Sequence, residues 1–265
     1  MVTGVAKTLF ELRSCIRLIQ WRRHPLHGSG CSGSCRGLMI ISHKHRFVFI
    51  KTRKTAGTSM EIALSKYCGP DDIITPISPN DESTRRSLGY RGPQNYKIPL
   101  SSYSRKAFLK AAYRRRRLSF RNHSSAAFIM KYLDDEKWNS YFKFCFERNP
   151  WDKVVSWYYW NFRTEPRPSI SEFIQSRDFN VIKGFELYTR SADILVDKVF
   201  FYENLSQSLE EIRDRVGLHE TPSLPVTKGN YREDTRSYRD ILSEKDRERI
   251  SRAYAREIAY FDYEW

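Results

Sequence analysis

A short loop between an apolar strand and a helix carries the residue types that hold phosphate groups. Phe47–Lys51 is typical of a strand, and Thr58–Leu64 is typical of the first turns of a helix. Backbone N–H groups at a helix N-terminus are unpaired and carry a partial positive charge, so they attract anions. Between these elements Lys54 adds a full positive charge, and Gly57 permits a close backbone approach. Hydroxyl donors are supplied by Thr55, Thr58 and Ser59. The pattern predicts a phosphate-binding loop, with an ordinary capped strand–turn–helix as the alternative.

The order of residues in this loop is not that of a Walker A loop, because Lys54 precedes Gly57. Lys-Thr-Ala-Gly-Thr-Ser after a strand instead resembles the 5′-phosphosulfate loop of sulfotransferases that use 3′-phosphoadenosine 5′-phosphosulfate (PAPS). One departure is Arg53, at a position where that family often has proline. The resemblance implies that the loop binds the cofactor through Arg53, Lys54, Thr55, Ala56, Gly57, Thr58 and Ser59.

A second group of candidate ligands follows another predicted strand, Tyr141–Phe146. Arg148 stands at its end, where a guanidinium can bind a phosphate through two parallel hydrogen bonds. Asn149 suits a helix N-cap and Pro150 suits the first helical position, which predicts a helix to about residue 162. Ser156 lies about two helical turns after Arg148 and shares its helix face. Taken singly, the arginine could form a surface ion pair and the serine a bond within its own helix.

The segment Arg-Asn-Pro-Trp-Asp-Lys-Val-Val-Ser-Trp-Tyr, from Arg148 to Tyr158, resembles the 3′-phosphate motif of carbohydrate-type sulfotransferases. The resemblance implies that Arg148 and Ser156 hold the 3′-phosphate of PAPS. Two further segments, 200–205 and 224–239, are also similar to the family, and the second of these implies help from Lys228 and Arg232. Together the similar segments cover about residues 45–265.

A general base must remove the proton from the hydroxyl that accepts the sulfuryl group. His123 stands 25 residues before Arg148, just ahead of a predicted helix. In sulfotransferases with this later arginine–serine motif a histidine in a comparable place acts as the base, and imidazole titrates near neutral pH. The alternatives are a structural role for His123 and a base supplied by Glu61 or Glu147.

Composition limits the partners and the location of this 265-residue chain. The net charge of +15 favours anionic partners, which include an acidic acceptor, but no motif for specific nucleic-acid binding accompanies it. No apolar run is long enough to cross a membrane, and the N-terminal stretch is compatible with peripheral membrane contact. The five cysteines show no repeated spacing, so we expect free thiols in a reducing cytoplasm, with localisation there or at the inner membrane surface.

Alternating strands and helices predict an α/β, P-loop-like, three-layer fold with a central parallel sheet flanked by helices. We expect residues 1–44 to be a flexible or peripheral extension and residues 45–265 to be the sulfotransferase domain. Pro, Gly, Asn, Asp and Ser are frequent in residues 69–104, so this stretch is predicted to lack regular structure, and the whole insertion 69–122 is expected on the acceptor side. Arg114–Arg117 is expected near the acceptor entrance, and the solvated polar face of a helix begun near Arg105 is the alternative for this run.

The sequence therefore predicts transfer of a sulfuryl group from PAPS to a hydroxyl, with Lys54 and His123 as catalytic residues. No metal is expected, since lysine and arginine supply the positive charge. The family resemblance implies a carbohydrate acceptor, and we expect a bacterial glycan. Two alternatives stay open: a nucleotide kinase or NTPase with a variant phosphate loop, and a non-catalytic polyanion-binding protein.

Overall fold

The computed structural model describes residues 39–120, 124–191, 193–225, 232 and 234–265. Its central feature is a five-stranded sheet with the strand order β3-β1-β2-β4-β7. The strands are β1 (Met39–Ser42), β2 (Phe47–Ile50), β3 (Ile73–Ile74), β4 (Phe142–Glu147) and β7 (Lys198–Phe201). β2, β4 and β7 pair in parallel, whereas β1 is antiparallel to both of its neighbours. The sheet is therefore mostly parallel, with one strand reversed.

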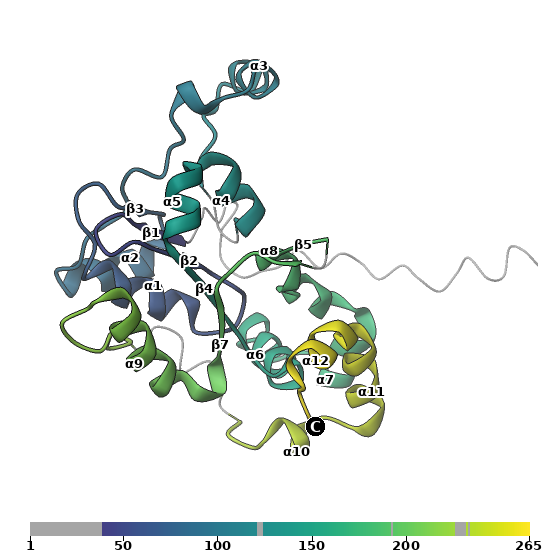
Figure 1. Cartoon of the computed structure of the whole chain (residues 1–265). Helices are drawn as coiled ribbons and strands as arrows, with labels where there is room; N and C mark the ends of the chain where they lie inside the picture. The colour runs from purple at the N-terminus through teal and green to yellow at the C-terminus, as the bar shows by residue number, and fades with distance from the viewer. Residues whose placement is uncertain (1–38, 121–123, 192, 226–231, 233) are drawn as a thin grey trace, which may run out of the picture. The chain divides into compact units, whose positions relative to one another are not determined.

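Helices cover both faces of this sheet, as the alternation of side chains along β2 requires (Figure 1). Phe47 and Phe49 pack with apolar residues of α1 (Gly57–Ser65) and α9 (Leu205–Val216). Val48 and Ile50 point to the opposite face and pack with α4 (Ala126–Tyr132), α5 (Asp135–Ser140) and α8 (Phe185–Tyr188). This three-layer α/β arrangement confirms the predicted fold class.

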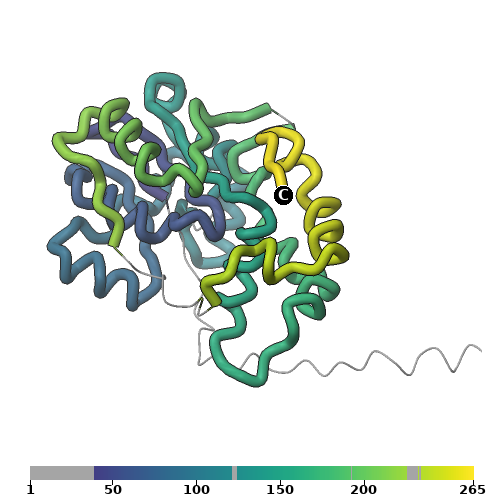
Figure 2. Tube along the Cα trace, turned by 90° about the horizontal axis from the view of Figure 1, so that it is seen from below, coloured from purple at the N-terminus to yellow at the C-terminus, as the bar shows by residue number. Residues whose placement is uncertain are grey.

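A third apolar cluster lies beyond the carboxyl end of β4. It joins α6 (Pro150–Asn161), α7 (Ile170–Ser176) and η2 (Asp178–Ile182) to the C-terminal α11 (Glu244–Ala253). Figure 2 shows the C-terminal helices on this side of the chain, away from α9. The remaining elements are η3 (Tyr202–Asn204), α10 (Tyr238–Ile241), α12 (Ala255–Phe261) and a hairpin of β5 (Thr189–Arg190) with β6 (Asp193–Ile194).

The first strand lies inside the stretch 1–44 that the sequence assigned to a peripheral extension. All four residues of β1 are buried, and they pair with both β2 and β3. Residues 39–44 are therefore part of the folded domain, because Met39–Ile41 fill both faces of the sheet beside β2. The remainder of the predicted extension, residues 1–38, lies outside the described residues.

The first part of the insertion, residues 69–104, was predicted to lack regular structure, and this prediction is wrong. It contains β3, η1 (Leu100–Ser102) and the nine-residue helix α2 (Pro79–Ser87). The helix considered to begin near Arg105 is present as α3 (Arg105–Tyr113). Ser78 caps α2 by accepting from the Asp81 backbone N–H, and Pro79 occupies its first turn. The same Ser-Pro-Asn-Asp run that suggests a turn is thus a helix start, since serine, proline and an acidic residue all favour that position.

The helix ends of this chain differ in how they are formed. The C-terminal helical segment 243–261 is interrupted at Tyr254, which leaves helical geometry and packs its buried ring against Phe179. Asn204 precedes α9 without a side-chain capping bond. The predicted cap Asn149 does make such bonds at the start of α6, and Ser169 makes one at the start of α7.

Candidate functional site

The carboxyl ends of the three parallel strands are joined by direct hydrogen bonds. After β2, the Thr52 hydroxyl donates to the Phe146 carbonyl at the end of β4. The Arg148 Nη1 group donates to the Lys54 carbonyl oxygen at 3.1 Å. On the other side of β4, the Asn149 backbone N–H donates to Glu203 Oε1 at 2.7 Å, just after β7. The two predicted motifs therefore meet at one edge of the sheet, where ligands bind in open α/β sheets.

The backbone of the loop between β2 and α1 has the geometry of an anion cradle. Lys54 and Ala56 both have left-handed conformations, with φ values of 62° and 55°. Residues in such alternating conformations turn successive N–H groups toward one point, which favours anions. Ala56 is the N-cap of α1 and provides no side-chain capping bond, and the helix begins at Gly57, one residue earlier than predicted.

Beneath this loop lies Lys51, a residue that the sequence reasoning did not select. Its Nζ donates to Thr58 Oγ1 at 2.7 Å, and the residue is buried. A Cβ at Gly57 would lie 2.6 Å from Lys51 Cγ and 2.9 Å from Cε. Gly57 is therefore required for the passage of the Lys51 side chain. The alternation of β2 gives a signal that could have revealed Lys51, because it continues the face of Phe47 and Phe49 that packs on α1.

Lys51 belongs to a buried network of charges. Glu61 has no solvent exposure and lies 3.9 Å from Lys51 Nζ and 3.4 Å from Arg85 Nη2. Arg85 also pairs with Glu82 at 3.1 Å. Burial raises the pKa of Glu61 to about 8, although Lys51 and Arg85 oppose this shift. A carboxyl enclosed in this way has no access to an acceptor, which argues against Glu61 as the general base.

The second carboxylate considered as a base, Glu147, is enclosed in the same manner. Its Oε2 pairs with Lys153 Nζ at 2.7 Å, and both side chains are almost fully buried. A Cβ at Gly184 would lie 2.9 Å from Glu147 Oε1, so the backbone of the chain closes over this pair. The pair therefore links β4 to α6 and the segment before α8, and it offers no open face to a substrate.

The guanidinium of Arg148 contacts a carboxylate and an aromatic ring. Its Nη2 and Nε both donate to one oxygen, Oδ2, of Asp152 in the first turn of α6, at 2.6 and 2.9 Å. Its guanidinium carbon lies 4.1 Å from the centre of the Tyr202 ring. The side chain is only 10% exposed. The Tyr202 ring and the Asp152 carboxylate together hold the planar guanidinium of Arg148 in one orientation, which suits a residue that binds phosphate.

Asp152 also binds a second predicted ligand, Arg232. Arg232 Nη1 lies 3.0 Å from Asp152 Oδ1, so the two arginines share one carboxylate. Ser156 and Trp160 follow Asp152 at one and two turns of α6, and Lys54 Nζ lies 5.6 Å from the centre of the Trp160 ring. This face of α6 therefore connects the arginine pair to the lysine of the loop, with the half-buried Ser156 between them.

The remaining predicted ligands have different settings. The Thr55 residue is buried, and its hydroxyl contacts Thr52 Oγ1 at 2.9 Å. Arg53 donates to the Val181 carbonyl in η2, and this contact turns its guanidinium toward the third apolar cluster. Ser59 lies half-buried in the first turn of α1. His123 and Lys228 lie outside the described residues.

Two kinds of feature are absent from the part of the chain that the structure describes. Among the described residues no cluster of three or more His, Cys, Asp and Glu side chains is placed to hold a metal ion. Within the same residues, no helix combines the length and the apolar character needed to cross a bilayer.

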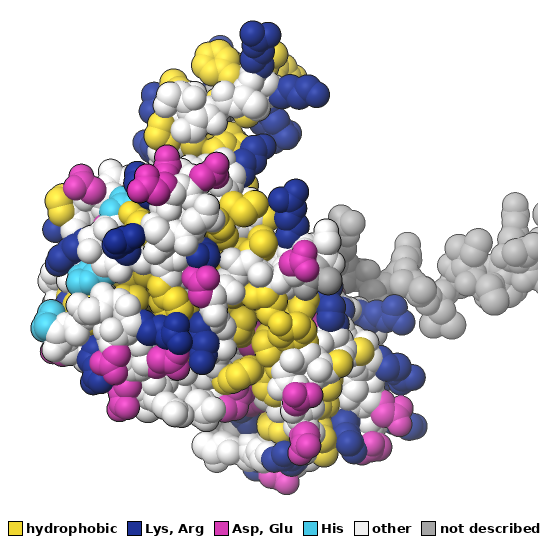
Figure 3. Space-filling model, viewed as in Figure 1, with side chains coloured by type: hydrophobic (Ala, Val, Ile, Leu, Met, Phe, Trp, Pro, Cys, Tyr) yellow, Lys and Arg dark blue, Asp and Glu magenta, His cyan; other side chains and the backbone are white. Residues whose placement is uncertain are grey.

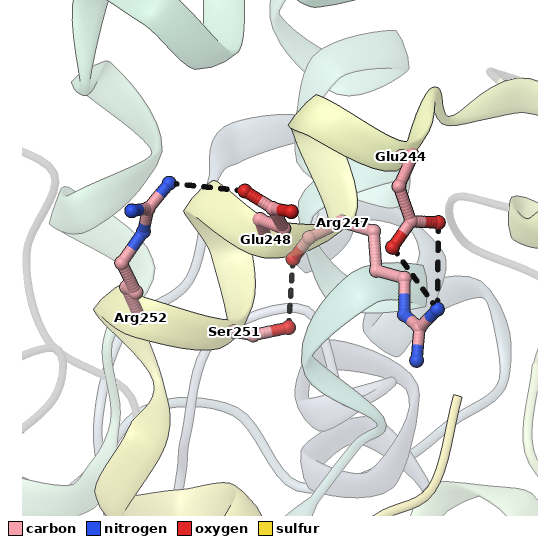
Figure 4. Close-up of a pocket in the computed structure, with 5 residues that line it drawn as sticks. All are labelled: Glu244, Arg247, Glu248, Ser251 and Arg252. Carbon is pink, nitrogen blue, oxygen red and sulfur yellow. Dashed lines mark hydrogen bonds and ion pairs between the residues drawn. The ribbon is translucent and has the colours of Figure 1, made fainter.

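A surface recess on α11 lies apart from these residues (Figure 4). It is lined by Glu244, Arg247, Glu248, Ser251 and Arg252. Its arginines pair with glutamates one turn away on the same helix, Arg247 with Glu244 and Arg252 with Glu248. Such ion pairs are usual on an exposed helix face. None of the predicted PAPS ligands lines the recess.

Sequence and structure comparisons relate this chain to known proteins. The model of the sulfotransferase family matches residues 38–183. A protein of the archaeon Archaeoglobus fulgidus, described as uncharacterized, is 37% identical over 109 residues, which are 39% of this chain and 88% of that protein. Among solved structures, mouse sulfotransferase SULT7A1 complexed with PAP is similar, with 13% identity, a TM-score of 0.41, and coverage of 82% of this chain and 85% of that one.

Proposed function

The chain belongs to the sulfotransferase family, as its sequence predicted, and from this premise we propose that it transfers a sulfuryl group from PAPS to a carbohydrate hydroxyl. The observation that carries the proposal is the meeting of the loop after β2 with Arg148 after β4, through the 3.1 Å hydrogen bond to the Lys54 carbonyl. This bond lies between the residues proposed for the 5′-phosphosulfate and those proposed for the 3′-phosphate, and such proximity supports one nucleotide bound by both.

In this proposal the loop holds the 5′-phosphosulfate. The left-handed backbone at Lys54 and Ala56 and the N-terminus of α1 supply N–H donors. During transfer the bond between sulfur and the bridging phosphate oxygen breaks, and a bond from sulfur to the acceptor oxygen forms. Negative charge then grows on the bridging oxygen, and the ammonium group of Lys54 stabilises it where it develops.

The 3′-phosphate would lie against Arg148, Arg232 and Ser156. Asp152 now accepts hydrogen bonds from both arginines and occupies the position of a counter-anion. A phosphate can accept from the same two guanidinium groups, because its oxygens match the geometry of a carboxylate. We therefore expect the nucleotide to share or replace Asp152 as the acceptor of these bonds.

The acceptor and the base remain proposals supported by the sequence. The likeness of Arg148–Tyr158 to the carbohydrate-type motif supports a carbohydrate hydroxyl, and the bacterial origin of the glycan stays a prediction. His123 is proposed as the base, since both alternative carboxylates are enclosed in buried ion pairs. It directly precedes Ser124 and Ser125, and Ser125 caps α4 by accepting from the Phe128 backbone N–H.

The proposal is tested by incubating the purified chain with sulfate-labelled PAPS and a panel of neutral and acidic oligosaccharides. We expect label on at least one oligosaccharide and release of adenosine 3′,5′-bisphosphate. In parallel, calorimetry compares adenosine 3′,5′-bisphosphate with ATP and 5′-AMP. Preferential binding of ATP with magnesium, or no preference among the three nucleotides, would overturn the proposal and favour the kinase or the polyanion-binding alternative. Binding of the bisphosphate with label on a non-carbohydrate hydroxyl alone would overturn only the choice of acceptor.

A further inference from the structure

A projecting segment, residues 99–118, extends from the domain and is called here the basic arm. It contains η1 and α3, and Figure 1 shows α3 beyond α4 and α5. Its base is anchored, because Ile98 and Phe120 are buried and the Ile98 backbone N–H donates to the Leu118 carbonyl at 3.0 Å. Tyr103 OH also accepts from the Leu118 backbone N–H. The arm is therefore a fixed projection of the fold with a folded helix at its end.

The outer side of α3 exposes large apolar residues. Tyr113 is 90% exposed and Leu109 68%, while Phe108, which is 51% exposed, lines a recess with Leu100 and Ala111 on another side of the helix. Leu109 and Tyr113 are one helical turn apart and share a face. Ala107 and Ala111, by contrast, lie on the more buried side of the helix. Exposed apolar residues on one helix face are typical of a surface that binds a protein or a membrane.

The same segment carries a concentration of positive charge. The arm has seven lysines and arginines and no acidic residue, and no acidic residue occurs anywhere between positions 83 and 133. The seven are Arg105, Lys106, Lys110, Arg114, Arg115, Arg116 and Arg117. Within the described part of the chain, no ion pair involves any of them. Figure 3 shows dark blue and yellow side chains side by side over this projection. An interfacial helix combines the same two features, apolar residues that enter a surface and cations beside them.

The position of the arm argues against a role in binding the sulfate acceptor. α5 leads into the amino end of β4, whereas α6 and Arg148 follow its carboxyl end. Figure 1 shows α3 on the side of α5 and remote from α6. The expectation that Arg114–Arg117 lies near the acceptor entrance stays a prediction, and the run itself follows the end of α3.

We propose that the basic arm docks the protein onto a lipid bilayer that contains anionic lipids. Leu109 and Tyr113 enter the region between head groups and acyl chains, while Lys106 and Lys110 reach the head groups from the same outer side. A soluble polyanion would use the cations but would not require Leu109, which has only apolar atoms to offer. Exposure of this leucine beside the cations is what favours a bilayer over an acidic polymer.

The test is cosedimentation of the full chain with vesicles of phosphatidylcholine, with or without phosphatidylserine, at near-physiological salt. We expect binding only to the vesicles that contain phosphatidylserine. Each cation near such a surface contributes roughly fivefold to partitioning, so Lys106→Gln with Lys110→Gln should lower it by at least about tenfold. The control Lys245→Gln with Arg249→Gln makes the same change of net charge on exposed positions of α11 and should change it by less than about twofold.

A second pair of variants separates a bilayer from a soluble polyanion. Leu109→Ser with Tyr113→Ser keeps the charge and should also lower vesicle binding by about tenfold, whereas Val181→Ser with Tyr260→Ser, at other exposed apolar positions, should not. Unchanged melting temperatures would verify that the variants fold. The proposal would be overturned if the arm variant Lys106→Gln with Lys110→Gln and its α11 control lost vesicle binding to the same extent. It would also be overturned if Leu109→Ser with Tyr113→Ser had no effect on vesicle binding. If the arm cations are needed for heparin binding and not for vesicle binding, the arm is a polyanion site instead.

Discussion

Replacing Arg148 by alanine should remove the preference of the protein for nucleotides with a 3′-phosphate. The guanidinium now makes two close hydrogen bonds to Asp152 and one to the Lys54 carbonyl, and it lies on the Tyr202 ring. The two donors that face Asp152 are those available to a phosphate. Their loss should therefore weaken binding of adenosine 3′,5′-bisphosphate and leave binding of 5′-AMP almost unchanged.

The size of the effect follows from these contacts. A hydrogen bond between charged groups contributes about 1.5–3 kcal/mol. Two such bonds to the phosphate would contribute about 3–6 kcal/mol in total. Since the bonds to Asp152 are given up when the phosphate binds, we expect the variant to lose the lower value, about 3 kcal/mol of binding free energy, which is roughly a hundredfold in Kd. The fold should persist, since Asp152 keeps Arg232 as a partner and its side chain is 20% exposed.

Isothermal titration of the wild-type chain and the Arg148→Ala variant with both nucleotides measures this difference. Arg252→Ala is a matched control, because it removes one arginine whose partner, Glu248, lies on the same exposed helix face of α11. If Arg148→Ala retained the wild-type ratio of the two dissociation constants, the assignment of Arg148 to the 3′-phosphate would be refuted. A loss of affinity for both nucleotides by the same factor would instead indicate that the residue only supports the loop through the Lys54 carbonyl.

Three further predictions concern the loop and the charges beneath it. Lys54→Ala should lower the rate of sulfuryl transfer by about a hundredfold or more with little change in melting temperature, and retention of wild-type turnover would exclude the catalytic role. Gly57→Ala should cost about 1–3 kcal/mol of stability in denaturant titration, because the added Cβ meets Lys51 at 2.6 Å, whereas Gly92→Ala, with no atom within 4 Å, should not. The raised pKa of Glu61 means that the folded state keeps a proton that the unfolded state has lost, so stability should fall as pH rises from about 4.5 to about 8 and then level off. This contribution, at most about 1.4 kcal/mol per pH unit, should be absent in Glu61→Gln, and equal pH slopes in the two proteins would contradict the argument.

Much of the site could be predicted because it depends on short-range patterns. The Lys54-to-Ser59 loop lies between one strand and one helix, and its function depends on backbone groups that the local sequence positions. The same holds for Arg148 and the cap Asn149, which bonds the backbone N–H groups of Trp151 and Asp152 in α6. Parallel strands bring their carboxyl ends to one edge, so the meeting of the two motifs also followed from the order of elements.

The network beneath the loop was decided by tertiary packing. Lys51, Glu61 and Arg85 come together because α1 and α2 pack near the end of β2. Burial then raises the pKa of Glu61, which an exposed carboxyl would not show. Sequence spacing carries no information on such burial. For the same reason Glu61 and Glu147 qualified as bases in the sequence, since composition cannot show that each would be enclosed with a buried cation.

The insertion 69–122 shows the same division between local pattern and tertiary context. Ser, Pro, Asn and Asp favour both turns and helix starts, and local preference alone cannot distinguish them. The helix α2 brings Arg85 into the core, 3.4 Å from Glu61, and the basic arm is anchored at its two ends by the buried Ile98 and Phe120. The sequence by itself determined the family and the two motifs that we propose to bind the phosphate groups of PAPS. The tertiary structure decided which charges are buried and which surface is exposed, because both depend on contacts between residues far apart in the chain.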